Sequence, residues 1–390
     1  MIMYWLDSLF YFISFYSKKP IPKKHIAFVR LSAGIGDWIT LLPSIVLLRS
    51  EFPKSKYTIF AIVDEQWAPA VELNGNIDYV VPVNRKKYGK NILYRVKINF
   101  YIKNLFIDKI FDFALFRRLS IGDSIVRASG ASIRIGYMPQ PDQPNELRIG
   151  DSLFTTLIED TKWEEHEIIR SARLLSLNQH HITTTNWTPR LELNTSSKKN
   201  KQFLCCPGAS VNARKWDPKK FAEVAKHIYL KTGWQPILVG SKADYAAIAA
   251  VLAQSSSLPW EVHDGSLGLL EYINLVSASN FIICNDSGPM HIGPAVQTYT
   301  VAIVPGAEFT AYSRYPSPNN FLKVVHSDSS CFNCRWNCKY EWNNQTEAPC
   351  VEFVDAHAVT GCVDEVIHLI GANAMRETQS TIYIRNDIEA

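Results

Sequence analysis

The stretch Phe281-Ile-Ile-Cys-Asn-Asp-Ser-Gly-Pro-Met-His-Ile-Gly-Pro-Ala295 changes character in its middle. Its first four residues are apolar and predict a buried strand, and the polar residues Asn285 to Gly288 predict a turn. Pro289 is tolerated in the first turn of a helix, so a helix is expected to begin there. A second apolar run, Thr298 to Val304, completes a strand, helix and strand unit. In such units a ligand binds beyond the carboxyl ends of the strands.

The turn between this strand and this helix carries groups that suit an anion. The backbone N–H groups of Ser287 and Gly288 lie where the first turn of a helix leaves donors without intrahelical partners, and that end of a helix attracts phosphate. His291, one turn further on, is expected to face the same place. An ordinary helix cap would explain Asp286 and Ser287 equally well, so the local pattern leaves both interpretations open.

The same order of strand, turn and helix recurs in both halves of the chain. In the first half, Lys24 to Val29 predict a strand, Arg30 to Asp37 a glycine-rich turn and Trp38 to Ser50 a helix. In the second half, the strand Phe203 to Cys206 leads into the turn Pro207 to Trp216. The sequence therefore predicts an α/β protein with two Rossmann-like doubly wound domains that face each other across a cleft.

The length of 390 residues also suits two domains. A polar tract near Asn194 marks the expected linker. The predicted segments are an N-terminal apolar and basic segment (1–24), a first Rossmann-like domain (25–190), a linker (191–201), a second Rossmann-like domain with a Cys-rich segment at 331–362 (202–370), and a tail (371–390).

Composition is that of a soluble globular protein, with 47% apolar and 20% charged residues. The net charge of +4 gives no general argument for nucleic acid. Its distribution is uneven, because ten Lys or Arg lie between Arg85 and Arg118 against only Asp108 and Asp112. This basic stretch is interleaved with aromatic residues and suits an anionic partner, either a phosphorylated glycolipid or a membrane surface. A solvated pair of helices is the alternative.

No apolar run has the length of a transmembrane helix. Residues 1–17 are apolar and rich in Trp and Tyr, and four lysines follow up to Lys24, which is typical of an interfacial helix. A terminal helix packed on the protein's own core is the alternative. No basic region precedes the apolar run and no small-residue cleavage site follows it, which disfavours a signal peptide. We therefore expect a cytoplasmic protein, with peripheral contact on the inner face of the cytoplasmic membrane left open.

Taken in order, these features resemble the ADP-heptose:lipopolysaccharide heptosyltransferases, glycosyltransferase family 9, which have the GT-B fold. The resemblance extends from residue 25 to residue 370. It depends on the following motifs: Gly36-Asp37 with Pro43 in the next helix, Arg134-Ile-Gly-Tyr137, His166 before a Leu-rich helix, Cys206-Pro-Gly-Ala-Ser210, Arg214-Lys-Trp216, Gly240 before a helix, Ser266-Leu267 and Asn285-Asp-Ser-Gly-Pro-Met-His291.

The resemblance implies an inverting transfer of heptose from an ADP-sugar to a hydroxyl of the lipopolysaccharide core, with no cofactor required for the chemistry. It implies that the first domain binds an anionic glycolipid acceptor and the second the nucleotide sugar. Asp37 matches the family's base, which accepts the proton of the attacking hydroxyl; a helix cap is the alternative for this residue. Predicted acceptor residues are Gly36, Arg117 and Arg118. Predicted nucleotide-sugar residues are Ser210, Arg214, Lys215, Asp244, Ser266, Leu267, Asp286, Ser287, Gly288 and His291.

Two features depart from the family pattern. Arg214-Lys215 stands where the family more often has Lys-Arg, which leaves open which cation reaches the phosphate; surface charge is the alternative for both. Trp38 is bulkier than expected after the carboxylate. A transferase with another sugar nucleotide or a protein acceptor, and a non-catalytic sugar-nucleotide-binding protein, are the competing functions.

The eight cysteines fall in two groups. Cys205, Cys206 and Cys284 lie in predicted strands and are expected to be small core residues. The second group has the spacing C-x2-C-x3-C-x11-C and predicts a structural Zn or Fe site, with free thiols or a disulfide as alternatives. Its members are Cys331, Cys334, Cys338 and Cys350, and Cys362 follows further on.

Overall fold

The structure is a computed structural model in which the described residues form two compact units. The described residues are 23–31, 34–139, 146–159, 165–175, 187–193, 199–329, 331–340, 342–343 and 345–386. Unit 1 takes in the residues up to Leu193 together with Tyr315–Pro318, and unit 2 takes in Asn194–Arg314 and the residues from Asn319 onward. The predicted interfacial helix at residues 1–17 lies outside the described residues.

Unit 1 is built on a six-stranded sheet in the order β3-β2-β1-β4-β5-β6, and every pair of neighbours is parallel. This is the doubly wound order, in which the chain changes direction between β1 and β4. The register pairs Val29 with Asp112, so the carboxyl ends of these two strands lie side by side. The strands are β1 (Lys24–Arg30), β2 (Tyr57–Asp64), β3 (Tyr79–Val83), β4 (Lys109–Asp112), β5 (Ile133–Tyr137) and β6 (Thr156–Ile158).

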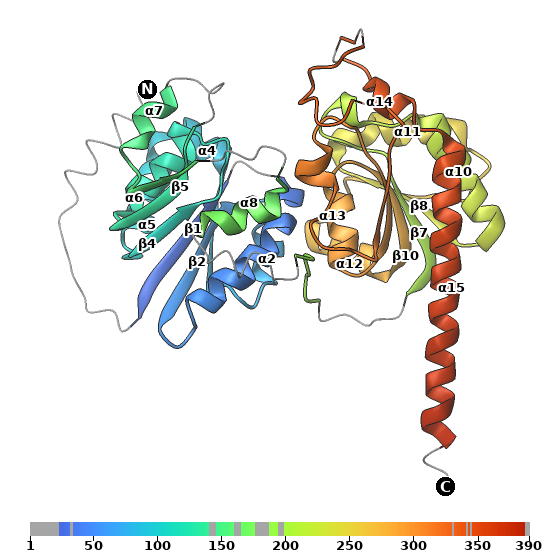
Figure 1. Cartoon of the computed structure of the whole chain (residues 1–390), viewed down its shortest axis with the longest axis horizontal. Helices are drawn as coiled ribbons and strands as arrows, with labels where there is room; N and C mark the ends of the chain where they lie inside the picture. Colours follow the sequence, from blue (N-terminus) through green and yellow to red (C-terminus); the bar gives the residue numbers. More distant parts are fainter. Residues whose placement is uncertain are drawn as a thin grey trace. The chain divides into compact units, whose positions relative to one another are not determined.

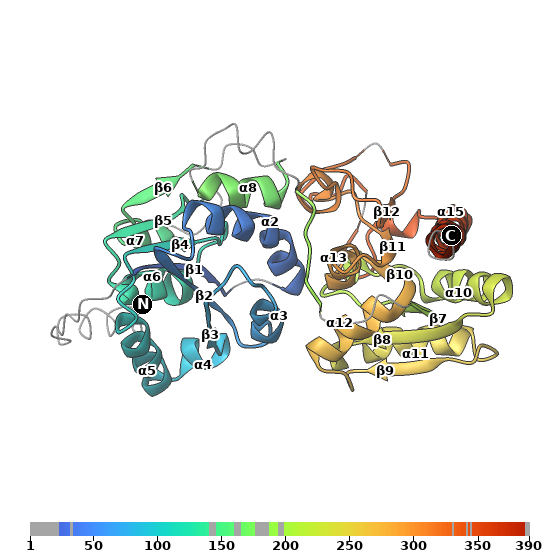
Figure 2. The same cartoon turned by 90° about the horizontal axis from the view of Figure 1, so that it is seen from below.

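Helices flank this sheet, with α2 against α8 in one group and α4, α5 and α6 in another (Figures 1 and 2). The helices of unit 1 are α2 (Ile35–Glu51), α3 (Ala68–Glu72), α4 (Arg85–Lys90), α5 (Ile92–Lys103), the π-helical turn η1 (Leu119–Asp123), α6 (Ser124–Ser129), α7 (Glu146–Asp151) and α8 (Glu167–Leu174). The basic stretch of the sequence analysis thus forms α4 and α5 and the segments after them.

Unit 2 repeats the same topology. Its six parallel strands have the order β12-β11-β10-β7-β8-β9, so the change of direction falls between β7 and β10. Cys206 pairs with Cys284 at this point. The strands are β7 (Asn200–Cys206), β8 (Gln235–Gly240), β9 (Glu261–Asp264), β10 (Ser279–Asn285), β11 (Tyr299–Ile303) and β12 (Leu322–Val325).

The helices of unit 2 cover both faces of its sheet. α10 contacts α11 and α15, whereas α12 and α13 contact each other and β10 (Figure 2). The helices are the short turns η2 (Asn212–Arg214), η3 (Lys242–Asp244) and η4 (Phe309–Ser313), and α10 (Pro218–Thr232), α11 (Tyr245–Gln254), α12 (Leu269–Ala278), α13 (Gly288–Ala295), α14 (Pro349–Glu352) and α15 (Ala356–Asn386). Residues 371–386, expected as a tail, continue α15.

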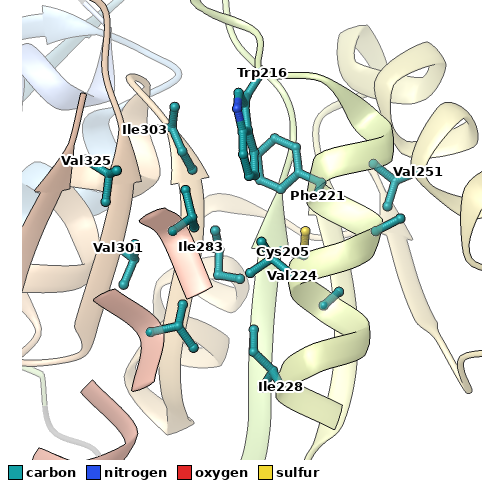
Figure 3. Packing of buried hydrophobic residues seen from close by; sticks show 14 of the residues in the cluster. Cys205, Trp216, Phe221, Val224, Ile228, Val251, Ile283, Val301, Ile303 and Val325 are labelled. Atoms are coloured by element: carbon teal, nitrogen blue, oxygen red, sulfur yellow. The ribbon is translucent and has the colours of Figure 1, made fainter. Parts of the chain in front are cut away.

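Each unit has its own apolar core. In unit 2, side chains from α10 meet side chains from β7, β10 and β11, as Figure 3 shows for Phe221, Cys205, Ile283 and Ile303. Trp216 lies at the end of this core with its ring edge-on to Phe221, 5.0 Å between centroids. The expected burial of the strand cysteines Cys205, Cys206 and Cys284 is confirmed. The two doubly wound α/β units are therefore as predicted.

Candidate active site

Asp37 lies in the first turn of α2, directly beyond the carboxyl end of β1. Its Oδ2 accepts a hydrogen bond from the backbone N–H of Gly34 (2.7 Å), so it caps its own helix. Its Oδ1 lies 3.4 Å from Nη2 of Arg30, and 33% of the side chain is exposed. The helix-cap interpretation is thus correct for one oxygen, and it does not exclude the other role. The cap fixes a carboxylate that remains accessible.

Arg30 connects Asp37 to a second, buried carboxylate. Its Nη2 lies 2.9 Å from Oε1 of Glu167, and its Nη1 donates to the carbonyl oxygen of Phe113. Oε2 of Glu167 accepts from Nη1 of Arg170 at 2.7 Å. Because the Arg30 and Glu167 side chains are 8% and 4% exposed, water screens this network little. Arg30 is therefore held rigidly beside Asp37.

The start of α8 supplies Glu167 to this network. His166 caps the helix, with its Nδ1 accepting from the backbone N–H of Ile168 at 3.2 Å. The sequence analysis singled out His166 but neither Glu167 nor Arg30. Both could have been suspected from position alone, since Arg30 opens the glycine-rich turn and Glu167 follows the marked histidine.

Asp112 at the carboxyl end of β4 is a further carboxyl group that the sequence analysis did not select. It is 1% exposed, and burial raises its pKa to about 7, with the neighbouring Asp123 adding to the rise. Oδ1 accepts from the N–H of Ala114 at 3.0 Å, while Oδ2 has no hydrogen-bond partner among the described residues. Gly122 permits this arrangement, because a Cβ there would lie 2.7 Å from Oδ2.

The three predicted acceptor residues have different environments. Gly36 lies in the first turn of α2 beside Asp37, and Arg118 is exposed at the start of η1. Arg117 is buried with no exposed side-chain surface, and its Nη2 pairs with Asp123 (3.0 Å) and Asp151 (2.9 Å). A guanidinium enclosed in this way has no exposed surface for a ligand, so this structure gives no support to an acceptor role for Arg117. Because Arg117 lies in a basic segment, the sequence did not reveal that it forms a buried ion pair.

In unit 2, Asn285 connects the ends of the two central strands. Its Oδ1 accepts from the backbone N–H of Trp216 (3.0 Å), and its Nδ2 donates to the carbonyl of Pro207 (2.8 Å). The side chain is fully buried, so these bonds are made in a dry setting. The first residue of the Asn-Asp-Ser-Gly motif is therefore structural, because it fixes the turn that carries Arg214.

Arg214 contacts three side chains from three separate segments. Its Nε lies 3.5 Å from Oδ2 of Asp286, and its Nη2 lies 3.2 Å from Oε2 of Glu308. Its guanidinium carbon is 5.5 Å from the ring centroid of Trp336. The sequence predicted Arg214 and Asp286 but missed Glu308 and Trp336, which come from a loop and from the Cys-rich segment. The Arg214 guanidinium therefore faces two carboxylates and an aromatic ring.

The remaining residues predicted to bind the nucleotide sugar lie near the carboxyl ends of the unit 2 strands or in the loops that follow them. Lys215 donates from Nζ to Oδ1 of Asn212 (3.0 Å), and Ser266 lies 3.3 Å from Nδ1 of His263. Ser210 and Leu267 lie in the loops before η2 and α12. Ser287 stands at the N-cap of α13 without a capping hydrogen bond, Gly288 begins the helix, and His291 is buried one turn on.

Asp244 is tied to the turn after β8. Its Oδ2 accepts from both the N–H (2.9 Å) and the hydroxyl (2.7 Å) of Ser241. A Cβ on Gly208 would lie 2.3 Å from the Asp244 carboxyl, and a Cβ on Gly240 would lie 2.8 Å from its Cβ. Both glycines of the family-like motifs are therefore needed so that the carboxylate can approach the carboxyl end of β7.

The Cys-rich segment is bonded to the same edge of the sheet. Asn333 and Arg335 donate backbone N–H bonds to the carbonyls of Gly306 (2.6 Å) and Ala307 (2.9 Å), and Ala348 donates to Ala213 (3.1 Å). These bonds explain how Trp336 reaches Arg214. The segment has the left-handed backbone at three residues, with φ of 58° at Asn333, 53° at Arg335 and 66° at Trp336.

The four predicted thiol ligands are close enough to influence each other. Partial burial raises the pKa of Cys334, and the thiols of Cys331 and Cys338 raise it further. Cys331 and Cys334 act in the same way on Cys350, where burial is again the largest cause. Within the described residues, however, no group of three or more His, Cys, Asp or Glu side chains has a metal-binding arrangement. No disulfide joins any of the eight cysteines, all of which are described.

One protein family matches part of the chain. Residues 153–335 match the family described as "Glycosyltransferase family 9 (heptosyltransferase)". The matched range begins in unit 1 and ends in unit 2. The matched range includes Arg214, Asp286, Glu308 and His291, whereas Asp37 precedes it.

The chain is also similar to individual proteins. Over 102 residues the chain is 34% identical to lipopolysaccharide heptosyltransferase 2 of Salmonella typhimurium. That stretch is 25% of this chain and spans only 29% of the relative. The fold resembles E. coli ADP-heptose lps heptosyltransferase II, with a TM-score of 0.66 at 17% identity over 89% of this chain and 99% of the other.

A second solved structure shares the fold. It is the iron-containing dodecameric glycosyltransferase TibC of enterotoxigenic E. coli, with a TM-score of 0.55 and 14% identity. The match covers 90% of this chain and 78% of the other. The likeness supports the GT-B fold for the two units.

Proposed function

We propose that this protein is an inverting glycosyltransferase that moves a heptose from an ADP-sugar to a hydroxyl of the lipopolysaccharide core. The observation that carries the proposal is the setting of Asp37, an accessible carboxylate fixed by Gly34 and Arg30 beyond the carboxyl end of β1. Doubly wound folds bind their ligands at this edge. The family 9 match and the heptosyltransferase relatives support heptose and ADP as the donor's parts.

On the acceptor side, Asp37 takes the proton. As the acceptor hydroxyl forms its bond to the anomeric carbon, its proton passes to the Asp37 carboxylate, whose second oxygen remains bonded to Gly34. Arg30 keeps the carboxylate from rotating away, because Glu167 holds the guanidinium from its other side. Displacement from the face opposite to the leaving group inverts the anomeric configuration.

On the donor side, Arg214 receives the departing diphosphate. Negative charge grows on the phosphate oxygens as the glycosidic bond breaks, and a guanidinium can bind two such oxygens at once. Asp286 and Glu308 hold Arg214 in place before the donor binds. We propose Lys215, Ser210 and the start of α13 as further phosphate contacts, and Asp244 as a contact to the nucleoside.

No cofactor is required by this mechanism. We propose a structural metal for the Cys-rich segment only, with Cys331, Cys334, Cys338 and Cys350 as its ligands. Their mutual electrostatic influence and the iron in the structurally similar TibC support this, but binding requires the thiols to converge from their described positions. Elemental analysis of protein purified without added metal tests it, and protein without stoichiometric Zn or Fe would contradict it.

The base assignment predicts a loss of transfer in Asp37→Asn. Asparagine still caps a helix, so we expect unchanged thermal stability and ADP affinity, with transfer slower by at least about 10²-fold. Product formation is measured by mass spectrometry with ADP-heptose and lipopolysaccharide core acceptor. The matched control is Asp217→Asn. The Asp217 carboxylate caps α10 by accepting a hydrogen bond from the backbone N–H of Lys219. Near-normal turnover in Asp37→Asn would remove the assignment.

The donor assignment predicts weaker ADP binding in Arg214→Gln and Arg214→Glu. The first variant removes the cation, and the second places a third carboxylate beside Asp286 and Glu308, so we expect affinity to fall by about tenfold and by more than tenfold respectively. Isothermal titration with ADP measures both. Lys219→Glu, an exposed charge reversal on α10, is the control. Equal affinities in all four proteins would contradict the role of Arg214.

Two competing functions remain to be separated by substrate. A screen of sugar nucleotides and of glycolipid and protein acceptors distinguishes heptose transfer to lipopolysaccharide from transfer of another sugar or transfer to protein. A protein that binds ADP-sugar yet forms no product with any acceptor would be a binding protein. We favour the enzyme, because a non-catalytic protein has no need for an accessible carboxylate fixed at this edge.

A further inference from the structure

Helix α5 of unit 1 buries two polar side chains and exposes several large apolar ones, although Ile102 lies in the apolar core. Arg95 and Asn99 are buried, at 1% and 2% exposure, whereas Leu93 is 82% and Phe100 56% exposed. In a helix on the surface of a globular protein, the apolar stripe normally faces the core. This helix therefore presents to its surroundings the side chains that elsewhere would stabilise the fold.

The buried polar side chains of α5 form hydrogen bonds to neighbouring elements. Nη2 of Arg95 lies 2.6 Å from the hydroxyl of Ser124, and its Nη1 lies 2.7 Å from the carbonyl of Ser120. The Tyr88 hydroxyl donates to Oδ1 of Asn99 at 2.7 Å, and the Arg95 guanidinium lies over the Tyr88 ring at 4.4 Å. A rotation of the helix that buried its apolar side would break these bonds, so the orientation is fixed.

The exposed apolar residues form one continuous side of the helix. Leu93, Val96 and Phe100 follow one another at spacings of three and four, which places them on one face. We call this side the α5 outer face: Ile92, Leu93, Val96, Lys97, Phe100 and Tyr101, all of them exposed. A helix of this length is about 18 Å long.

The segment that forms α4 and α5 carries charge of a single sign. Between Arg85 and Ile107 there are seven Lys or Arg and no Asp or Glu. Lys86, Lys87 and Lys90 on the adjoining α4 are exposed, as is Lys97. Two copies of the chain joined through this face would bring lysines against lysines, which opposes self-association.

We propose that the α5 outer face docks on an anionic lipid bilayer surface. An apolar and aromatic helix side with flanking lysines is suited to lie in the plane of the interface, with Leu93 and Phe100 among the acyl chains and the lysines at the headgroups. None of the described helices is long and apolar enough to cross a membrane. This inference goes beyond the proposed transfer reaction and does not depend on it.

Vesicle co-sedimentation of the full chain tests the proposal. The probe is vesicles of phosphatidylglycerol and phosphatidylcholine, with pure phosphatidylcholine vesicles for comparison, at 0.15 M salt. We expect binding to the anionic vesicles to weaken at least fivefold in Leu93→Ser/Lys97→Glu. The matched control is Lys226→Glu/Leu230→Ser on α10, where a lysine and a 73% exposed leucine have the same spacing of four.

A second measurement locates the contact. Acetylation of Lys97 and Lys226 by acetic anhydride is followed by peptide mass spectrometry with and without anionic vesicles. We expect slower acetylation of Lys97 only. Thermal unfolding confirms that both double variants are folded, and ADP titration confirms that unit 2 is intact.

Three outcomes would overturn the proposal. The first is equal vesicle binding by the α5 variant and the α10 control, which would assign any binding to another part of the chain. The second is equal binding to neutral and anionic vesicles. The third is concentration-dependent self-association in sedimentation velocity that the α5 variant abolishes while neither protein binds vesicles, because the face would then join two copies.

Discussion

Two carboxyl groups at the same edge of the first sheet have opposite environments. Asp37 is one-third exposed, with both oxygens near N–H donors, whereas Asp112 is buried and has one oxygen without a hydrogen-bond partner. A carboxylate that must accept a proton from substrate needs access, so Asp37 suits the base. Asp112 instead keeps its proton up to a pH of about 7, because burial raises its pKa by favouring the neutral form.

This difference predicts an unusual pH dependence of stability. The pKa of Asp112 is raised to about 7 in the folded protein, above the ordinary value of 3.8. The folded state therefore retains a proton that the unfolded state has lost, and the contribution of Asp112 to stability falls as pH rises from about 4 to about 7. In Asp112→Asn this component disappears. The measurement is the free energy of unfolding of the wild type minus that of the variant, obtained by urea denaturation across this pH range. We expect this difference to fall by about 1–4 kcal/mol.

A flat difference across that pH range would show that Asp112 ionises normally. Asp123, Arg117 and Arg30 also act on Asp112, and the difference between the two proteins cancels their own titration where their environment is unchanged. Asp108→Asn, an exposed carboxylate before β4, is the control.

At the scale of the element, strands and turns were the most predictable features. The apolar runs beginning at Lys24, Phe203 and Phe281 became central strands, because a strand buried on both faces requires an apolar sequence. Candidate site residues could be predicted where they follow such strands. Glu308 and Trp336 could not be found in this way, since they reach Arg214 through loops whose course depends on backbone bonds to Gly306 and Ala307.

Helix sides were less predictable than helix positions. The basic stretch correctly indicated helices, but its composition could not reveal that Arg95 is buried beneath the apolar side of α5 or that Arg117 is enclosed by Asp123 and Asp151. A buried ion pair and a solvated lysine look alike in a sequence. Only the tertiary partners distinguish them.

Helix ends in unit 2 give a paired stability prediction. Gly233 ends α10 with φ of 66°, a left-handed backbone that costs a residue with a Cβ about 1 kcal/mol. Gly361 lies inside α15, and a Cβ there would meet nothing within 4 Å. We expect Gly233→Ala to lower the free energy of unfolding by about 1 kcal/mol and Gly361→Ala to raise it by about 0.5–1 kcal/mol. Urea denaturation measures both, and a common sign would contradict the prediction.

At the scale of the whole molecule, the same topology occurs twice and carries different candidate site residues in each unit. Unit 1 carries the accessible carboxylate, and unit 2 carries Arg214 with its carboxylate partners. Each unit has a separate apolar core, so each can respond to its own ligand. The donor should therefore stabilise one unit more than the other.

This prediction is tested by hydrogen exchange of the full chain with and without ADP. At 100 times its dissociation constant, ADP should stabilise unit 2 by about 2.7 kcal/mol, which slows exchange of amides that open only on unfolding by about 100-fold. We expect this for β7 and β10 and little change for β1 and β4. Equal slowing in both sheets would show that the two units unfold together, and no slowing would contradict ADP binding to unit 2.

The return of Tyr315–Pro318 to unit 1 has a consequence for how the chain can be divided. The polypeptide passes from one unit to the other three times, after Leu193, after Arg314 and after Pro318. A single protease nick in the first connection would yield two fragments on a denaturing gel. The carboxyl-terminal fragment would still carry Tyr315–Pro318, which contacts the amino-terminal fragment through the ring pair Tyr315–His166 and the hydrogen bond from the Trp187 N–H to the Ser317 hydroxyl, so the fragments are held together without a covalent bond. Separating the two units as independent proteins therefore requires a graft that restores Tyr315–Pro318 to the amino-terminal half, and truncation at one boundary does not achieve it.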